Sequence, residues 1–269
     1  MTTSSPSVDF AEETLDSLAS REGTVVVFAD AGKALSPAGS HVDGLTGGAL
    51  TRALGAADWK PRPRKVRTLA FPSGMAAERV IVATLGEDPD RDAARRAGGA
   101  IAAALAKGDV TVCTAGVGDR TLVAELVWAM VLRLYEFREY KKSPDDEDAA
   151  APRTITVMGD APEALAAASA PFAALAEGVF FTRDLVNEPA NRLTTDEFAA
   201  RLAAMGELGL EVEILGEDRL RELGAHALLA VGQGSDSETK IVVMKWTGGA
   251  DEAPLALLGK GVVFDTGGI

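Results

Sequence analysis

The feature that most limits the fold of this chain is a repeated alternation of two sequence patterns. Short runs of apolar and β-branched residues alternate with longer, alanine-rich stretches in which apolar residues recur at helical spacing. Such short runs are typical of buried strands, and the longer stretches are typical of helices. We therefore expect the first part of the chain to form an α/β sandwich. The clearest strands are Thr24–Ala29, Arg79–Leu85, Val110–Thr114 and Thr154–Met158, and the clearest helices are Arg91–Lys107 and Thr121–Arg133.

A long alanine-rich segment, Pro162–Val186, is expected to be a helix that leads out of this first domain. It ends at Asn187-Glu188-Pro189, because proline and asparagine stop a helix. The sequence therefore predicts an N-terminal domain over residues 1–160, a connecting helix over 161–187 and a second domain over 188–269. Near the start of the chain, the mixed pattern of Phe10–Ala19 predicts a further helix.

The charge of the chain limits its partners. Its 27 lysines and arginines are outnumbered by 40 aspartates and glutamates, which gives a net charge of −13. An acidic surface repels phosphate backbones, which argues against nucleic acid as a partner and favours cations. The one cysteine, Cys113, lies in an apolar run and is expected to be a buried, inert thiol. Because the sequence shows neither a signal peptide nor a long uncharged apolar stretch, we expect a cytoplasmic protein without a membrane partner.

A chemically unusual segment lies at Leu255–Ile269. Two apolar runs, Leu255–Leu258 and Val262–Phe264, read as strands, and glycines flank Lys260 between them, with Asp265 directly after the second run. A buried charge is costly unless it is paired, neutralised or bound to a metal, and a desolvated lysine can offer a neutral nitrogen to a metal ion. The residues alone leave two interpretations open: an ion pair or a surface-directed lysine of structural importance only, or a metal site.

Several other kinds of site lack the residues that they need. The two histidines, His41 and His226, are far apart in the sequence, and there is no H-E-x-x-H, C-x-x-C or G-x-S-x-G motif. A zinc site built from histidine and cysteine is therefore excluded. If a metal binds, carboxylates and lysine are its ligands, which favours Mn²⁺ or Mg²⁺, or Zn²⁺ in an unusual ligand set.

A glycine-containing loop, Gly116-Val117-Gly118, follows the predicted strand Val110–Thr114 and precedes a predicted helix. A strand, a glycine loop and a helix N-terminus together can form a phosphate-binding loop. The third glycine of the dinucleotide fingerprint is missing, because position 121 is threonine. A plain strand-to-helix turn is the alternative interpretation.

Three motifs together resemble the leucyl aminopeptidase (M17, cytosolic aminopeptidase) family, and they occur in that family's order and at similar spacing. They are Arg183-Asp184-Leu185-Val186-Asn187-Glu188-Pro189 with Asn191, then Val231–Ser235, then Gly259-Lys260-Gly261 with Phe264–Ile269. The resemblance implies a macro-like α/β N-terminal domain followed by the start of an α/β metallopeptidase catalytic domain of phosphorylase/hydrolase-like fold.

The resemblance also implies a function. Proteins of this family are two-metal peptidases that remove N-terminal residues, leucine among them, from peptides with a free amino terminus, usually as homohexamers. Lys260 matches the lysine that binds one metal ion through its amine, and Asp265 matches the aspartate that bridges both ions. The ions would be Mn²⁺ or Zn²⁺, or Mg²⁺.

The family's remaining site residues have no counterpart in the sequence. A catalytic lysine, a catalytic arginine and further metal-binding carboxylates, some within an N-T-D-A-E-G-R motif, are expected beyond Ile269, so we expect no catalytic residue within residues 1–269. Because two ligands cannot hold two ions tightly, the 269-residue polypeptide is expected to be truncated within the catalytic domain and inactive. The alternatives are a macro-like module that binds a phosphate-bearing ligand without catalysis, and a scaffold subunit.

Overall fold

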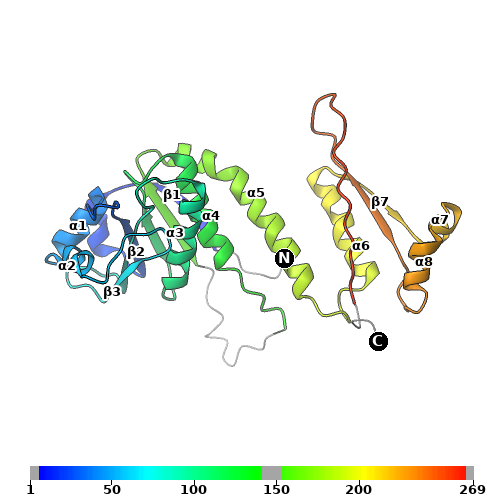
Figure 1. Ribbon diagram of the computed structural model, residues 1–269, viewed down its shortest axis with the longest axis horizontal. Helices are drawn as coiled ribbons and strands as arrows, with labels where there is room; N and C mark the ends of the chain where they lie inside the picture. Colours follow the sequence, from blue (N-terminus) through cyan, green and yellow to red (C-terminus); the bar gives the residue numbers. More distant parts are fainter. Residues whose placement is uncertain (1–5, 141–152, 265–269) are drawn as a thin grey trace. The chain divides into compact units, whose positions relative to one another are not determined.

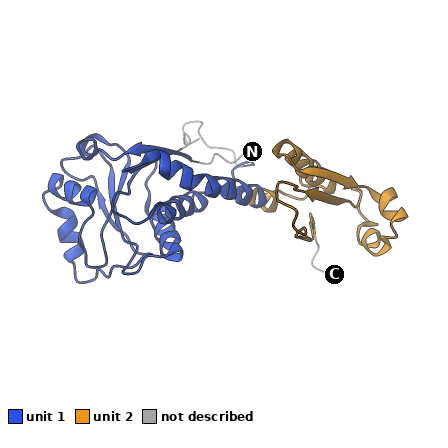
Figure 2. Cartoon of the chain, turned by 90° about the horizontal axis from the view of Figure 1, so that it is seen from above, with its two compact units in different colours: residues 1–182 blue, residues 183–269 orange. Residues whose placement is uncertain are grey.

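The structure is a computed structural model that describes residues 6–140 and 153–264. The chain divides into two compact units, residues 1–182 and 183–269, which Figure 2 colours separately. Each unit is described by itself.

Unit 1 is built on a six-stranded sheet with the strand order β1-β6-β5-β2-β4-β3 (Figure 1). Neighbouring strands are parallel, except that the edge strand β3 runs antiparallel to β4. The strands are β1 (Ser7–Glu12), β2 (Thr24–Phe28), β3 (Arg67–Ala70), β4 (Arg79–Ala83), β5 (Val110–Cys113) and β6 (Thr154–Gly159).

Helices cover both faces of this sheet. Val26 and Phe28 of β2 point into one core, which α3 (Arg91–Ala104), α4 (Arg120–Arg133) and part of α5 (Pro162–Asn187) also line. Val25 and Val27 point into the opposite core, with the short 3₁₀ helix η1 (Leu15–Ser20), α1 (Pro37–Leu45) and α2 (Ala49–Gly55). Two covered faces are what a mostly parallel sheet requires, and they confirm the expected α/β class.

The expected helix over Phe10–Ala19 is wrong in its first half. Residues Ser7–Glu12 form β1, which pairs in register with Thr154–Gly159 of β6, and only Leu15–Ser20 turns as a 3₁₀ helix. The partner strand lies far away in the sequence, so the local pattern gave no sign of the pairing. The mixed local pattern does not determine the conformation of Ser7–Glu12. The hydrogen bonds of the ladder with β6 determine it instead.

The described part of the chain has one helix, α5, that is long and apolar enough to cross a membrane by length and composition, with a mean hydropathy of 1.6 over its most apolar window. Leu165 and Phe180 of α5 are buried in the core of unit 1, and the Phe180 ring stacks on Tyr135 with the ring centroids 5.4 Å apart. One such helix is weak evidence for a membrane span.

Unit 2 contains a two-stranded antiparallel ribbon and several short helices. The ribbon pairs β7 (Glu211–Leu215) with β8 (Ile241–Lys245). The helical elements are α6 (Thr195–Ala203), η3 (Ala204–Leu208), α7 (Glu217–Glu222) and α8 (His226–Gly232).

The two expected terminal strands are absent. Leu255–Leu258 and Val262–Phe264 have no strand ladder, and Leu255, Leu257 and Leu258 are 85–96% exposed. A strand is stabilised by hydrogen bonds to a neighbour, and no segment among the described residues pairs with this one. The apolar pattern is typical of a strand, but a local pattern does not show whether a partner strand is present.

Candidate functional site

Lys260, one of the two expected metal ligands, lies in the extended segment that follows β8 and its side chain is exposed. An exposed ammonium group meets no desolvation cost, so the argument from a buried charge does not apply to it in this structure. The other expected ligand, Asp265, lies outside the described residues.

The lysines of unit 2 differ in what they contact. Lys240 pairs with Asp196 (Nζ–Oδ1 2.8 Å) and Glu238 (Nζ–Oε2 3.4 Å), and Lys245 pairs with Glu211 (Nζ–Oε2 3.2 Å). Lys260 has no ion pair or hydrogen bond with any residue that the structure describes. No carboxylate among those described residues competes for its amine.

The backbone beside Lys260 lies close to a side chain of α6. A Cβ atom placed on Gly261 would lie 2.8 Å from Cε1 of Phe198, which belongs to α6. Such a contact is closer than side chains tolerate, so glycine is required here for the segment to pack on the helix. The same construction on Gly259 meets no atom within 4 Å. The segment with Lys260 therefore rests against α6 through its second glycine.

The start of α6 is held by a helix cap and by an arginine that also contacts Glu188 of the first sequence motif. Thr194 caps the helix by accepting a hydrogen bond from the Glu197 N–H (3.2 Å). Arg201 then donates to Glu197 (Nε–Oε1 2.8 Å) and to Glu188 (Nη2–Oε1 2.9 Å), whose side chain is only 5% exposed. These bonds to Glu197 and Glu188 raise the pKa of Arg201. Glu188 thus acts in this structure as a buried anchor for α6.

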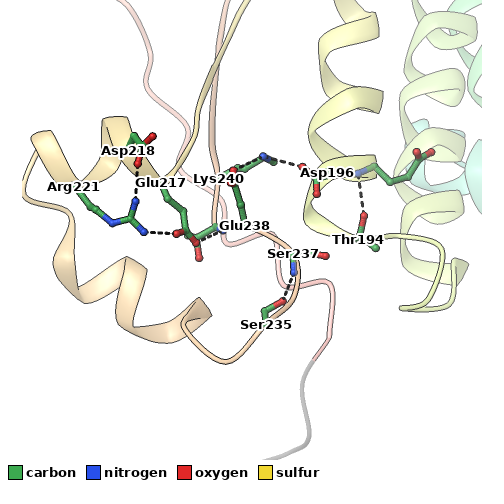
Figure 3. A network of polar contacts seen from close by, with 11 residues as sticks. Thr194, Asp196, Glu217, Asp218, Arg221, Ser235, Ser237, Glu238 and Lys240 are labelled. Carbon is green, nitrogen blue, oxygen red and sulfur yellow. Dashed lines mark hydrogen bonds and ion pairs between the residues drawn. The ribbon is translucent and has the colours of Figure 1, made fainter.

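A second set of contacts, shown in Figure 3, joins the loop before β8 to two helices. Lys240 reaches Asp196 on α6, and this hydrogen bond is the main cause of its raised pKa. Glu217 at the start of α7 accepts a hydrogen bond from the Thr239 N–H (3.1 Å) and pairs with Arg221 (2.6 Å). Local sequence patterns do not reveal these pairs, since the partners are distant in the chain.

The described residues contain no group of three or more histidine, cysteine, aspartate or glutamate side chains that could hold a metal ion. Cys113 is fully buried, as expected, and burial raises the pKa of its thiol to about 12, with the Glu13 carboxylate adding to the effect. A thiol in that state is a poor nucleophile and a poor metal ligand.

Comparison with known proteins gives consistent matches over both units. Residues 26–144 match the family described as "Cytosol aminopeptidase family, N-terminal domain", and residues 180–269 match "Cytosol aminopeptidase family, catalytic domain". The second range includes Lys260, Asp265 and all three sequence motifs.

Curated relatives include the "Probable cytosol aminopeptidase" of Cereibacter sphaeroides, 49% identical over 97% of this chain and 53% of that protein. A protein of the same description from Dinoroseobacter shibae is 47% identical over 97% of this chain and 52% of its own length. The chain therefore spans about half the length of these relatives.

Two solved structures share the fold. A mutant of tomato leucine aminopeptidase matches with a TM-score of 0.70 and 18% identity, over 88% of this chain and 50% of that one. The bottromycin maturation enzyme BotP in complex with Mn matches with a TM-score of 0.62 and 26% identity, over 82% of this chain and 44% of that one.

Proposed function

Because the chain belongs to the cytosol aminopeptidase family, we propose that it forms part of a metal-dependent aminopeptidase that releases N-terminal residues, leucine among them, from peptides with a free amino terminus. The names of the curated relatives support this activity. The observation that carries the proposal is Lys260: an amine between two glycines that has no partner among the described residues, inside the region that matches the family's catalytic domain.

We propose Lys260 and Asp265 as metal ligands. Their donor chemistry fits, since an amine and a carboxylate five residues later are nitrogen and oxygen donors suited to Mn²⁺, Zn²⁺ or Mg²⁺. The manganese complex of BotP supports a divalent ion. When bound, two such ions supply Lewis acidity for the scissile carbonyl and lower the pKa of a bound water.

The residues of this chain have defined tasks in that chemistry. Lys260 would bind a metal ion through its neutral amine, so it must first lose a proton, and metal affinity should rise with pH. The backbone at Gly259 has open space around it, and the close approach of Gly261 to Phe198 would fix the position of the segment. Asp265 would hold metal through its carboxylate.

Three further features of the proposal follow from family membership. Since Lys260 and Asp265 supply only two of the required ligands, we expect the 269-residue polypeptide to be inactive by itself. We also propose that the active form is a homohexamer, and the relatives' designation as cytosol aminopeptidases supports a cytoplasmic location.

The proposal is tested by metal content and peptidase activity in the complete gene product. With Mn²⁺ added, hydrolysis of leucine p-nitroanilide should be lost in Lys260→Ala and Asp265→Ala, and elemental analysis should show reduced bound metal in both. Lys260→Arg is the sharper variant, because it keeps the positive charge but cannot offer a neutral amine. Lys245→Ala, which removes an exposed lysine paired with Glu211, should keep metal and activity. Full metal content in Lys260→Arg would contradict the ligand assignment.

The structure does not favour the alternative of a phosphate-binding module. The loop with Gly116 and Val117 does line a cavity, but the lining includes Asp30 and Glu87 and no lysine, arginine or histidine. For the alternative of a scaffold subunit, absence of peptidase activity in the complete gene product would be the decisive observation.

A further inference from the structure

A cavity of about 460 Å³ opens in unit 1 at one edge of the six-stranded sheet. Three loops form it, and each follows the carboxyl end of a parallel strand: residues 29–37 after β2, 85–89 after β4, and 116–117 after β5. Its volume lies within the range of small-molecule sites. The cavity is far larger than a single trapped water requires.

The position of the cavity in the topology favours a ligand site. From β2, the chain continues through α1, α2 and β3 to β4, which lies on one side of β2. From β5, on the other side of β2, the chain continues through α4 to β6, farther in the opposite direction. The connections after β2 and β5 thus leave in opposite directions, which opens a crevice between the two strand ends. Open α/β sheets bind ligands at such a switch point.

The walls of the cavity are largely apolar and its charged groups are acidic. Phe28, Leu35, Leu85 and Val117 contribute apolar surface, and the two charged lining residues are Asp30 and Glu87. Lys33, the cation of the β2–α1 loop, is not among the lining residues.

Asp30 is held in place by its own loop. Its Oδ1 accepts a hydrogen bond from the Ala34 N–H (2.8 Å), and its backbone N–H donates to the Ala34 carbonyl (2.9 Å). Oδ2 has no hydrogen-bond partner among the described residues. One carboxylate oxygen thus fixes the loop, while the other can receive a donor from a ligand.

The helix ends near the cavity do not favour an anion. The first turns of α3 and α4 are already capped by carboxylates, since Asp90 accepts from the Ala93 N–H (2.7 Å) and Asp119 from the Leu122 N–H (2.9 Å). At α1, Ser36 accepts from the Gly39 N–H (3.2 Å), and Pro37 has no N–H to donate. At each of these termini, one of the N–H groups that an anion would use is therefore already bonded to a capping side chain, and α1 lacks a further donor at Pro37.

We propose that this cavity binds a small organic cation, a protonated amine carried on an apolar body, with the ammonium group between Asp30 and Glu87. The proposal concerns unit 1 and is independent of the metal-dependent activity proposed for unit 2. The ligand proposed for this cavity is a cation, whereas the phosphate-bearing ligand considered for the Gly116–Gly118 loop is an anion.

The test uses the 269-residue chain and three probes that differ only in their end group: 4-phenylbutylamine, 4-phenylbutan-1-ol and 4-phenylbutanoate. NMR titration should move amide signals of residues 29–37, 85–89 and 116–117. The amine should bind about tenfold more tightly than the carboxylate, because two carboxylates attract one charge and repel the other. Its affinity should fall when the salt concentration is raised from about 50 to about 500 mM.

Variants assign the charge preference to the two side chains. Asp30→Asn with Glu87→Gln should weaken the amine several-fold and leave the alcohol unchanged, because asparagine can still accept the Ala34 hydrogen bond. Asp88→Asn, a neighbouring exposed carboxylate that does not line the cavity, is the matched control. Equal or tighter binding of 4-phenylbutanoate, tight binding of ADP-ribose, or an amine affinity unchanged in the double variant would overturn the proposal.

Discussion

At the scale of the residue, two carboxylates in unit 1 differ in what compensates for their burial. Glu125 is 4% exposed and is matched by Arg95 through two hydrogen bonds (2.6 and 3.0 Å). Glu13 is half-buried, accepts a hydrogen bond from the Ala115 N–H (3.1 Å) and has no arginine partner of this kind among the described residues, and it also faces the charge of Asp160. Burial, with that like charge, raises the pKa of Glu13 above its ordinary value. The charged form of Glu13 is therefore disfavoured in the folded state.

We therefore predict that Glu13→Gln increases the stability of the fold, and that the increase depends on pH. A carboxyl with a raised folded-state pKa contributes stability below its unfolded pKa of 4.5, and that contribution is lost as the pH rises through the folded pKa. The variant keeps an acceptor for the Ala115 N–H but has no charge. Thermal unfolding from acid to neutral pH should show a melting-temperature difference, variant minus wild type, that grows with pH. Glu12→Gln, at an exposed neighbour, should give a smaller and flatter difference.

A second prediction at this scale concerns the two glycines beside Lys260. Gly261→Ala should push the segment away from Phe198 and weaken Mn²⁺ binding by the complete gene product roughly tenfold, the size typical of displaced supporting contacts at metal sites. Gly259→Ala has open space and should change the affinity much less. Isothermal titration with Mn²⁺ measures both. Equal affinities would show that the Phe198 contact does not position the amine.

At the scale of the element, the agreement between sequence and structure depends on how local the deciding interactions are. The α/β alternation predicted the parallel strands β2, β4 and β5 and the helices α3 and α4, because each has its own strong pattern. It missed β1, because a strand distant in the sequence pairs with it. It wrongly assigned strands to the two terminal apolar runs, because no described segment pairs with them. The lack of a partner for Lys260 among the described residues and the cavity at the strand ends both depend on the folded arrangement, although the residue types at positions 260 and 265 were visible beforehand.

The packing of α3 on α4 gives a prediction at the same scale. Arg95→Ala would leave the buried Glu125 with only Arg91, at 3.8 Å, and should lower stability by about 2 kcal/mol. Arg96→Ala removes an exposed pair with Asp92 on the same helix and should cost less than about 0.5 kcal/mol. Hydrogen exchange of the α4 amides would measure both changes. Similar protection in the two variants would show that the buried pair contributes no more than the surface pair.

At the scale of the whole chain, apolar side chains are unusually exposed in the segment before Lys260. Leu255, Leu257 and Leu258 are nearly fully exposed, whereas the core leucines of unit 1, such as Leu18 and Leu126, are fully buried. Exposed apolar clusters of this kind mark surfaces that another segment or molecule covers.

We therefore predict that the 269-residue chain binds the dye ANS under native conditions. Replacing Leu255, Leu257 and Leu258 together by serine should reduce the dye fluorescence without lowering the unfolding midpoint, because exposed side chains contribute little packing. Leu175→Ser, at a 59% exposed position on α5, is the control and should leave most of the fluorescence. A lower unfolding midpoint in the triple variant would instead show that these leucines pack in the native state.

The pairing of β1 with β6 has a consequence for biosynthesis. Ser7 and Thr154 are partners across 147 positions of the chain, so β1 leaves the ribosome well before its partner β6 and must wait for it. At ordinary translation speeds of about 5–20 residues per second, that wait is roughly 7–30 s. During this interval β2, β4 and β5 can already assemble, whereas the nascent amino-terminal strand stays available to chaperones.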